Sequence, residues 1–145
     1  MESFVKDTAA ELGVDGTWLW RICTHESKTF YNGSPQPWPF TLNYKKKGRY
    51  FHSHQGALYV LRQILEKDGS NALVDVGMCQ VNLRWHGDKV ESPEDLLDFR
   101  ANVRIAAGIL AEGKRIRGTW EKAAGYYHSP GNSKRAQWYV NQLQR

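Results

Sequence analysis

The chain has 145 residues, of which 41% are hydrophobic and 12% aromatic, with a net charge of +5. This length predicts one domain over residues 1–145 and excludes a multidomain enzyme. The composition excludes a disordered protein, because a chain of this size buries about two-thirds of its unfolded surface. The modest positive charge suits an anionic partner, such as a cell-wall polymer, a lipid head group or nucleic acid, without choosing among them.

Apolar residues recur at helical spacing in three segments of the first half of the chain. Asp15 and Ser53 stand where helix N-caps belong, and Gly13 stands where a C-terminal cap belongs. A stretch rich in proline stops the second helix, because proline lacks an amide donor. The expected elements are helices over 4–12, 15–26 and 53–68, a break over 32–39, and two short strands of a hairpin over 40–44 and 49–52.

The second half of the chain predicts one strand, which bends at Gly77, and several more helices. The expected elements are that strand over 73–81, a helix start at Ser92, a long helix that follows over 102–116, and shorter helices capped by Thr119 and Ser133. Together the segments predict an α+β, mainly helical domain of six helices with a small β element. No internal repeat or linker is seen.

Three features that could suggest a partner or a metal have plainer explanations. The basic run over 45–49 lies between aromatic-rich segments and is interpreted as a solvated hairpin turn. No stretch approaches the roughly 18 apolar residues of a membrane span, and the N-terminus does not look like a signal peptide, so the chain as it stands is expected to be soluble. His52 and His54 would need a third ligand to hold a metal, and no metal site is predicted.

Glu26 is the residue that points to chemistry. The apolar stripe of its helix includes Leu19 and Ile22, and Glu26 continues this stripe at i+7 and i+4 from them. Because burial disfavours the anion, a carboxyl group on such a stripe is usually paired or stays protonated, and the protonated form is a general acid. An alternative stays open, in which Glu26 swings into solvent beside Lys28.

Two further patterns bear on this chemistry. A common type of glycosidase needs a second carboxylate about 5 to 9 Å from the first. Asp75 is the candidate, although a local structural hydrogen bond is its plainer role. Aromatic residues gather in loops and at strand edges, where they suit stacking against sugars or bases as well as an ordinary core. These residues are Trp38, Phe40, Tyr44, Tyr50, Tyr126 and Tyr127.

The two cysteines, Cys23 and Cys79, are too few for a zinc site or a disulfide framework. A single bridge between them would stabilise the fold by roughly 4 kcal/mol in an oxidising compartment, because it closes a long loop. Two buried thiols that pack as small hydrophobic groups are an equally open interpretation.

Three segments occur in an order that carries a resemblance to a known family. They are Glu26-Ser27, Asp75-Val76-Gly77-Met78-Cys79-Gln80-Val81-Asn82, and Ala124-Gly125-Tyr126-Tyr127-His128. Together they resemble the soluble lytic transglycosylases of the lysozyme-like superfamily, whose pattern is Glu-Ser at a helix end, then Gly-Leu-Met-Gln, then an Asn-containing helix and Ala-Tyr-Asn. The segments 37–43, 75–77 and 127–130 resemble the subgroup that accompanies type IV secretion and conjugative pilus systems. The resemblance covers 9–139.

The resemblance implies a lysozyme-like domain, of the goose-type lysozyme kind, that cleaves peptidoglycan in the periplasm after a signal peptide has been removed. Glu26 would be the sole catalytic acid and base, cutting between N-acetylmuramic acid and N-acetylglucosamine to leave a 1,6-anhydro ring. The Tyr127 hydroxyl would point at Glu26. The implied partners are glycan strands and components of a secretion or pilus system, with no cofactor and no nucleic acid. The implied substrate-binding residues are Ser27, Gln80, Asn82, Tyr126 and Tyr127.

Two departures from the family pattern are Cys79 in place of Met and His128 in place of Asn. If Glu26 and Gln80 meet in one cleft, as the resemblance implies, Cys23 and Cys79 are near neighbours. A disulfide between these cysteines is therefore expected in a periplasmic protein.

Other interpretations stay open beside the family's activity. Asn102 matches the family's helix asparagine, with either a structural or a binding role. A muramidase would use Asp75 together with water, and a wall-binding module would hold glycan without turnover. A nucleic-acid binder would rest on charge and aromatic residues alone.

Overall fold

The computed structural model describes residues 1–31 and 34–144, and describes side chains for 1–27 and 36–144. The described part is mainly helical with two small antiparallel sheets. The helices are α1 (Glu2–Glu11), α2 (Gly16–Ser27), α3 (His54–Asp68), α4 (Leu83–His86), α5 (Phe99–Arg117), α6 (Trp120–His128) and α7 (Ser133–Leu143), with 3-10 turns η1 (Gly87–Lys89) and η2 (Pro93–Leu97). The strands are β1 (Lys28–Tyr31), β2 (Ser34–Pro37), β3 (Thr41–Tyr44), β4 (Lys47–Tyr50), β5 (Val74–Val76) and β6 (Val81–Asn82).

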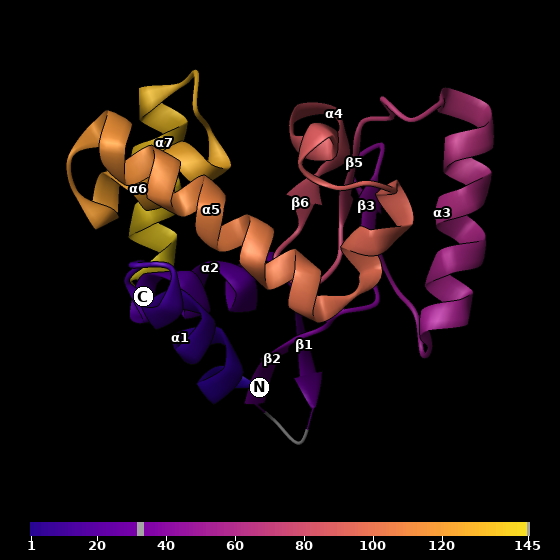
Figure 1. Cartoon of the computed structure of the whole chain (residues 1–145), viewed down its shortest axis with the longest axis horizontal. Coiled ribbons are helices and arrows are strands. Elements are labelled where there is room, and N and C mark those ends of the chain that lie inside the picture. The colour runs from indigo at the N-terminus through magenta and orange to yellow at the C-terminus, as the bar shows by residue number, and fades with distance from the viewer. Residues whose placement is uncertain (32–33, 145) are drawn as a thin grey trace.

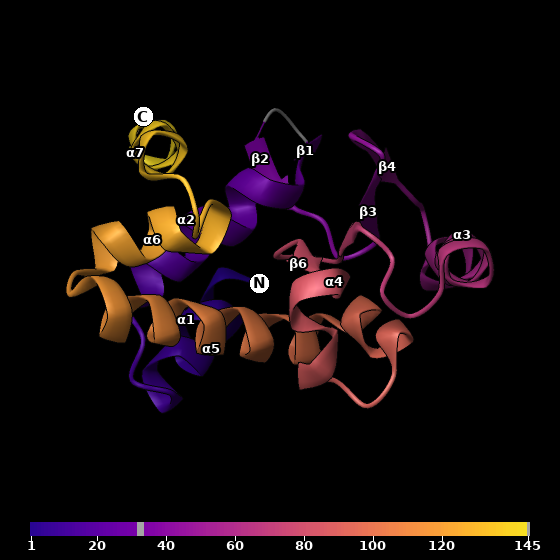
Figure 2. The same ribbon diagram turned by 90° about the horizontal axis from the view of Figure 1, so that it is seen from above.

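A helical lobe, made of α1, α2, α5, α6 and α7, occupies one side of the molecule (Figure 1). The four-stranded sheet, in the order β4-β3-β5-β6, and α4 lie in the middle, and α3 stands at the far end. Figure 2 shows α5 running from the helical lobe to the side of the sheet. Helix α5 therefore connects the two halves, and residues from both halves can meet along it.

Helix α5 buries one face, because small and apolar residues repeat on it at helical spacing. Val103, Ala106 and Leu110, which recur at helical spacing, are all buried, and the expected long helix is confirmed. At Gly113 an added Cβ would lie 2.9 Å from the Tyr126 ring, so α6 approaches more closely than a larger residue would allow. This close contact determines how near α6 packs to α5 and therefore where the Tyr126 ring lies.

Most of the predicted helices and the β3–β4 hairpin are confirmed, with ends shifted by a few residues. Asp15 accepts a hydrogen bond from the backbone N–H of Trp18 at 3.0 Å, and Ser53 accepts one from that of Gly56 at 3.1 Å, as N-caps do. Two capping predictions are wrong. The caps of α5 and α7 are Asp98 and Asn132, and the segment after Ser92 forms only η2.

The expected bent strand over 73–81 is in fact two short strands, β5 and β6, that pair with each other. The chain reverses between them in the turn 77–80, where Gly77 has a φ of 85° and Gln80 a φ of 53°. Glycine reaches a positive φ without steric cost, so Gly77 permits a full reversal where a bend was expected. The short helix α4, which follows β6, was not predicted.

The expected break over 32–39 is also partly wrong, because β1 and β2 form an antiparallel hairpin. Its residues 32 and 33 lie outside the described residues. Two prolines are tolerated in β2 because each strand of a two-stranded ribbon has an edge that needs no amide donor.

The basic run over 45–49 is exposed, as predicted for a solvated hairpin turn. Lys45 and Lys46 have φ values of 54° and 66°, the backbone conformation of a tight two-residue turn that joins β3 to β4. In the described part of the chain no helix is both long and apolar enough to cross a membrane. No group of His, Cys, Asp or Glu among these residues is arranged to hold a metal ion.

Candidate functional site

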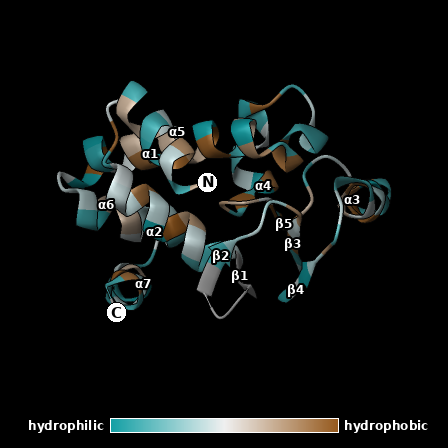
Figure 3. Ribbon diagram, turned by 90° about the horizontal axis from the view of Figure 1, so that it is seen from below, coloured by the Kyte–Doolittle hydropathy of each residue, from teal (hydrophilic) through white to brown (hydrophobic). Residues whose placement is uncertain are grey.

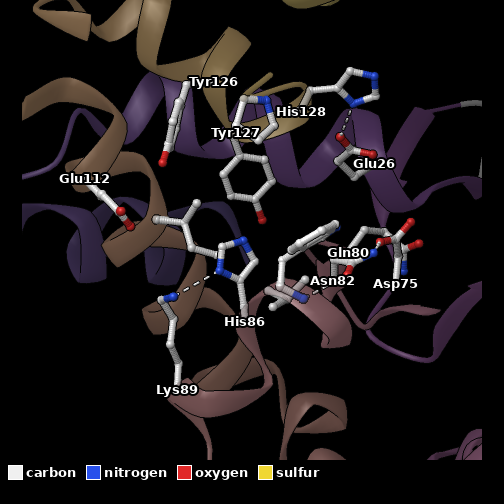
Figure 4. A pocket seen from close by; sticks show the side chains of 14 residues that line it. Glu26, Asp75, Gln80, Asn82, His86, Lys89, Glu112, Tyr126, Tyr127 and His128 are labelled. Carbon is white, nitrogen blue, oxygen red and sulfur yellow. Dashed lines mark hydrogen bonds and ion pairs between the residues drawn. The ribbon is translucent and has the colours of Figure 1, made fainter. Parts of the chain in front are cut away.

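A cleft of about 490 Å³ lies where the helical lobe meets the sheet (Figure 4). Its walls come from the end of α2, from β5 and β6, from α4 and from α5 and α6. The lining residues are Glu26, Asp75, Gln80, Val81, Asn82, Trp85, His86, Lys89, Ile109, Glu112, Tyr126, Tyr127, His128 and Pro130. Five of the predicted functional residues are therefore brought together from distant parts of the sequence, namely Glu26, Gln80, Asn82, Tyr126 and Tyr127.

Glu26 stands in the last turn of α2 and faces this cleft (Figure 4). The buried face of α2 includes Leu19 and Ile22, and the helical period carries Glu26 to the edge of that face. Its side chain is 19% exposed, and its Oε1 lies 3.5 Å from Nδ1 of His128. The carboxyl group is thus held between protein groups and does not swing into bulk solvent.

His128 is held in place by the residue behind it. Its ring lies parallel to the Tyr139 ring, with centroids 4.2 Å apart. Tyr139 is fully buried. Burial, and after it the negative charge of Glu26, raise the pKa of Tyr139 well above its ordinary value. In the sequence, His128 stands out only as a departure from the family pattern, and no motif indicates a role for Tyr139.

Asp75 enters the same cleft from β5. Its pKa is raised to about 6, chiefly by burial and secondly by the charge of Glu26, while the hydrogen bond from Asn82 and the charge of His128 lower it. The Asn82 Nδ2 donates to Asp75 Oδ1 at 2.9 Å, and the Asn82 Oδ1 accepts from the Trp85 backbone N–H at 3.2 Å. Asn82 therefore orients Asp75 and caps α4.

The raised pKa of Asp75 predicts a pH-dependent stability. In the unfolded chain this carboxyl has its ordinary pKa of 3.8, so between that value and about 6 the folded state binds the proton more tightly. Stability is then greatest below the unfolded pKa and falls as pH rises toward about 6. We expect Asp75→Asn, which keeps an acceptor for Asn82, to remove this fall and to be more stable at pH about 7.5 by on the order of 3 kcal/mol.

Urea unfolding at several pH values checks this expectation. Asp7→Asn, an exposed change on α1, is the matched control and should keep the wild-type pH dependence. An unchanged slope in Asp75→Asn would contradict the assignment of the pH dependence to this carboxyl.

The side chain of Asn102 stabilises the turn 77–80 through hydrogen bonds. Its Nδ2 donates to the backbone oxygens of Val76 and Leu96, both at 2.8 Å, and its Oδ1 accepts from the Cys79 N–H at 2.8 Å. An added Cβ at Gly77 would lie 2.4 Å from this Nδ2, so the close approach requires glycine. Asn102 is fully buried, and its role is structural.

The side chains of Gln80 and Tyr127 donate hydrogen bonds to backbone oxygens of the site. The Gln80 Nε2 donates to the oxygens of Gly77 at 2.9 Å and Thr41 at 3.2 Å, which leaves its Oε1 as the group it can offer a ligand. The Tyr127 hydroxyl donates to the Cys79 oxygen at 2.7 Å and not to Glu26, which corrects the expected direction. Burial, and then the charges of Glu26 and Asp75, raise the pKa of Tyr127 well above its ordinary value.

Ser27, which the resemblance implies binds substrate, does not line the cleft. It is fully buried, its hydroxyl is within donating distance of the oxygens of Cys23 and Met78, and it accepts from the Trp38 N–H at 3.0 Å. Cys23 and Cys79 form a disulfide, the pairing that the resemblance implies. The bridge and Ser27 together tie the end of α2 to the turn that carries Gln80.

The opposite wall contains residues that no sequence motif indicates. The Nζ of Lys89 lies 3.0 Å from Nδ1 of His86, whose pKa is lowered by burial first and by Lys89 second. Glu112 follows Ile109 by one helical turn on α5, and both line the cleft. Trp85 is 69% exposed at its rim.

Comparison with known proteins finds no relative: no family model matches the chain, and no curated protein or solved structure matches it significantly.

Proposed function

We propose that the chain is a lytic transglycosylase of peptidoglycan, with a lysozyme-like fold. It cleaves the β-1,4 bond between N-acetylmuramic acid and N-acetylglucosamine in the periplasm, and opens the wall for a secretion or pilus apparatus. The observation that carries the proposal is Glu26, a carboxyl group 19% exposed at the end of α2, facing a cleft of about 490 Å³. The family resemblance of the segments around this cleft supports the same activity.

In the proposed reaction Glu26 acts twice. The protonated carboxyl donates its proton to the glycosidic oxygen as the bond from the muramic C1 to that oxygen breaks, and the N-acetylglucosamine leaves with a free hydroxyl. The carboxylate then takes the proton from the muramic 6-hydroxyl, whose oxygen bonds to C1 and closes the anhydro ring. Glu26 ends protonated, as it began, and no water is consumed.

The remaining cleft residues would bind and orient the glycan. Gln80 Oε1 can accept a hydrogen bond from a sugar N–H or hydroxyl, and the Trp85 and Tyr126 rings offer faces for sugar stacking. The His128 imidazole, 3.5 Å from Glu26, restrains the carboxylate and, when protonated, stabilises its anion.

A true muramidase is the second candidate, because Asp75 shares the cleft and its pKa is raised by burial and, after it, by the charge of Glu26. Such an enzyme would use the second carboxylate to activate water or to bond to the sugar. The hydrogen bond that Asn82 donates to Asp75 would orient the carboxylate for either role. The products distinguish the two enzymes, since hydrolysis leaves a reducing muramic end heavier by one water.

The experiment is mass spectrometry of the material released from purified sacculi. We expect 1,6-anhydro muropeptides, and no increase in reducing ends. Reducing ends that disappear in Asp75→Asn would instead establish the muramidase. Sedimentation with sacculi without any release would indicate a wall-binding module and would contradict both enzymes.

A further inference from the structure

A second hollow, of about 320 Å³, lies between α3 and the β3–β4 hairpin and shares no lining residue with the cleft. We call it the basic groove. Figure 1 shows α3 at the end of the molecule away from the helical lobe. The groove is lined by Leu42, Tyr44, Lys45, Lys47, Arg49, Val60, Gln63, Ile64 and Lys67.

Two facing surfaces form the basic groove. In the hairpin, Leu42 pairs with Arg49 and Tyr44 with Lys47, so these four side chains share one face of the ribbon. On α3, the lining positions 60, 63, 64 and 67 follow helical spacing and share one face of the helix. The ribbon and the helix turn these faces to each other, and their side chains leave part of the space between them unfilled.

The floor of the groove is apolar. Leu42 is 1% exposed and Ile64 is 6% exposed, and Val60 lies half-buried beside them. A recessed apolar surface of this kind gains free energy when an apolar side chain of a ligand displaces its water.

The rim of the groove is positively charged. None of its cations, Lys45, Lys47, Arg49 and Lys67, forms an ion pair with a described carboxylate. The nearby Asp68 accepts a hydrogen bond from the Tyr44 hydroxyl. Figure 3 shows the hydrophilic colour on β4, next to α3. The rim therefore carries a positive potential that an anionic ligand would neutralise.

We propose that the basic groove binds an acidic segment of a partner protein, in which an apolar side chain stands between carboxylates. The apolar side chain would fill the floor, and the carboxylates would pair with the lysines and the arginine at the rim. A flat membrane surface cannot reach a recessed floor, and a phosphate backbone has no apolar group to fill it. A peptide that combines the two chemistries matches both features of the groove.

The edge of the sheet adds a further recognition element. Strand β4 is the outermost strand of its sheet, and all four of its residues are exposed. An extended peptide can pair with such an edge through its backbone while alternate side chains enter a neighbouring groove. The acidic segment is therefore expected to bind in extended form along β4.

The test uses a short fluorescent peptide of repeated Glu-Leu-Glu and the whole chain. We expect binding that shifts the amide resonances of β3, β4 and α3, and that a Gln-Leu-Gln peptide does not reproduce. Lys47→Glu combined with Arg49→Glu should weaken binding about tenfold or more, because two attractions become repulsions. The matched control is Lys134→Glu with Arg135→Glu on α7, which changes the net charge equally and should bind as the wild type does.

Several outcomes would overturn the proposal. One is the absence of peptide binding. Another is that the two double variants weaken peptide binding equally, which would show that net charge and not the groove determines the affinity. Shifts confined to this face on adding phosphatidylglycerol vesicles or a single-stranded oligonucleotide, without a response to the peptide, would assign the groove to a membrane or a nucleic acid. Because the readout is binding, its failure leaves the proposed enzyme activity untouched.

Discussion

Glu26→Gln is expected to release anhydro-muropeptides from sacculi at least about a hundredfold more slowly than the wild-type chain. The amide has nearly the size and shape of the carboxyl group, so the packing at the end of α2 is retained. It cannot donate a proton to the glycosidic oxygen or remove one from the muramic 6-hydroxyl. The loss therefore falls on the chemical step, while sedimentation with sacculi is expected to persist.

The matched control for this variant is Glu66→Gln, the same change on the exposed face of α3. It should release products at the wild-type rate. Thermal unfolding of both variants checks that any loss of activity does not come from loss of the fold. Wild-type release by Glu26→Gln would remove this carboxyl from the mechanism and with it the proposed reaction.

The position of Glu26 could be predicted because a helix has a fixed period. Once Leu19 and Ile22 define the buried face of α2, the direction of the next residue on the stripe follows from local geometry alone. The helix caps at Asp15 and Ser53 were predictable for the same reason, since a capping side chain binds an amide only a few residues away. These features needed no knowledge of how distant segments pack.

The turn 77–80 could not be predicted in this way. Glycine at position 77 indicates an irregular backbone, but the reversal depends on Asn102, which lies 23 residues after Cys79 and binds its N–H. The direction of the Tyr127 hydroxyl likewise depends on the Cys79 oxygen, 48 residues away. Long-range partners of this kind are invisible to periodicity and local propensity.

His128 shows the same limit at the centre of the site. Its contact with Glu26 requires that α6 end beside α2 and that α7 bring Tyr139 behind the imidazole. The sequence predicts α7 as a helix, but helical spacing carries no information about which ring Tyr139 stacks against. The helical lobe could be predicted as a set of helices, and the way they meet at the cleft could not.

Removal of the Cys23–Cys79 disulfide, by changing both residues to serine, is expected to lower the free energy of unfolding by roughly 4 kcal/mol. The bridge joins residues 56 apart in sequence, and without it the unfolded chain gains the freedom of that loop. Urea unfolding measures the loss. Wild-type protein treated with a reductant should lose a similar amount, whereas the double variant should not respond to the reductant.

Removal of the disulfide is also expected to loosen the placement of Glu26 relative to Gln80 in the cleft. Cys23 precedes Glu26 by one turn of α2, and Cys79 precedes Gln80 in the turn 77–80, so the bridge fixes the distance between the carboxyl group and the amide. The Cys79 backbone is also bonded to Asn102 and Tyr127, and these contacts limit how far the turn can drift. Product release should therefore fall less than in Glu26→Gln. Titration of two reactive thiols in the unfolded, unreduced protein would show that no bridge forms and would refute both effects.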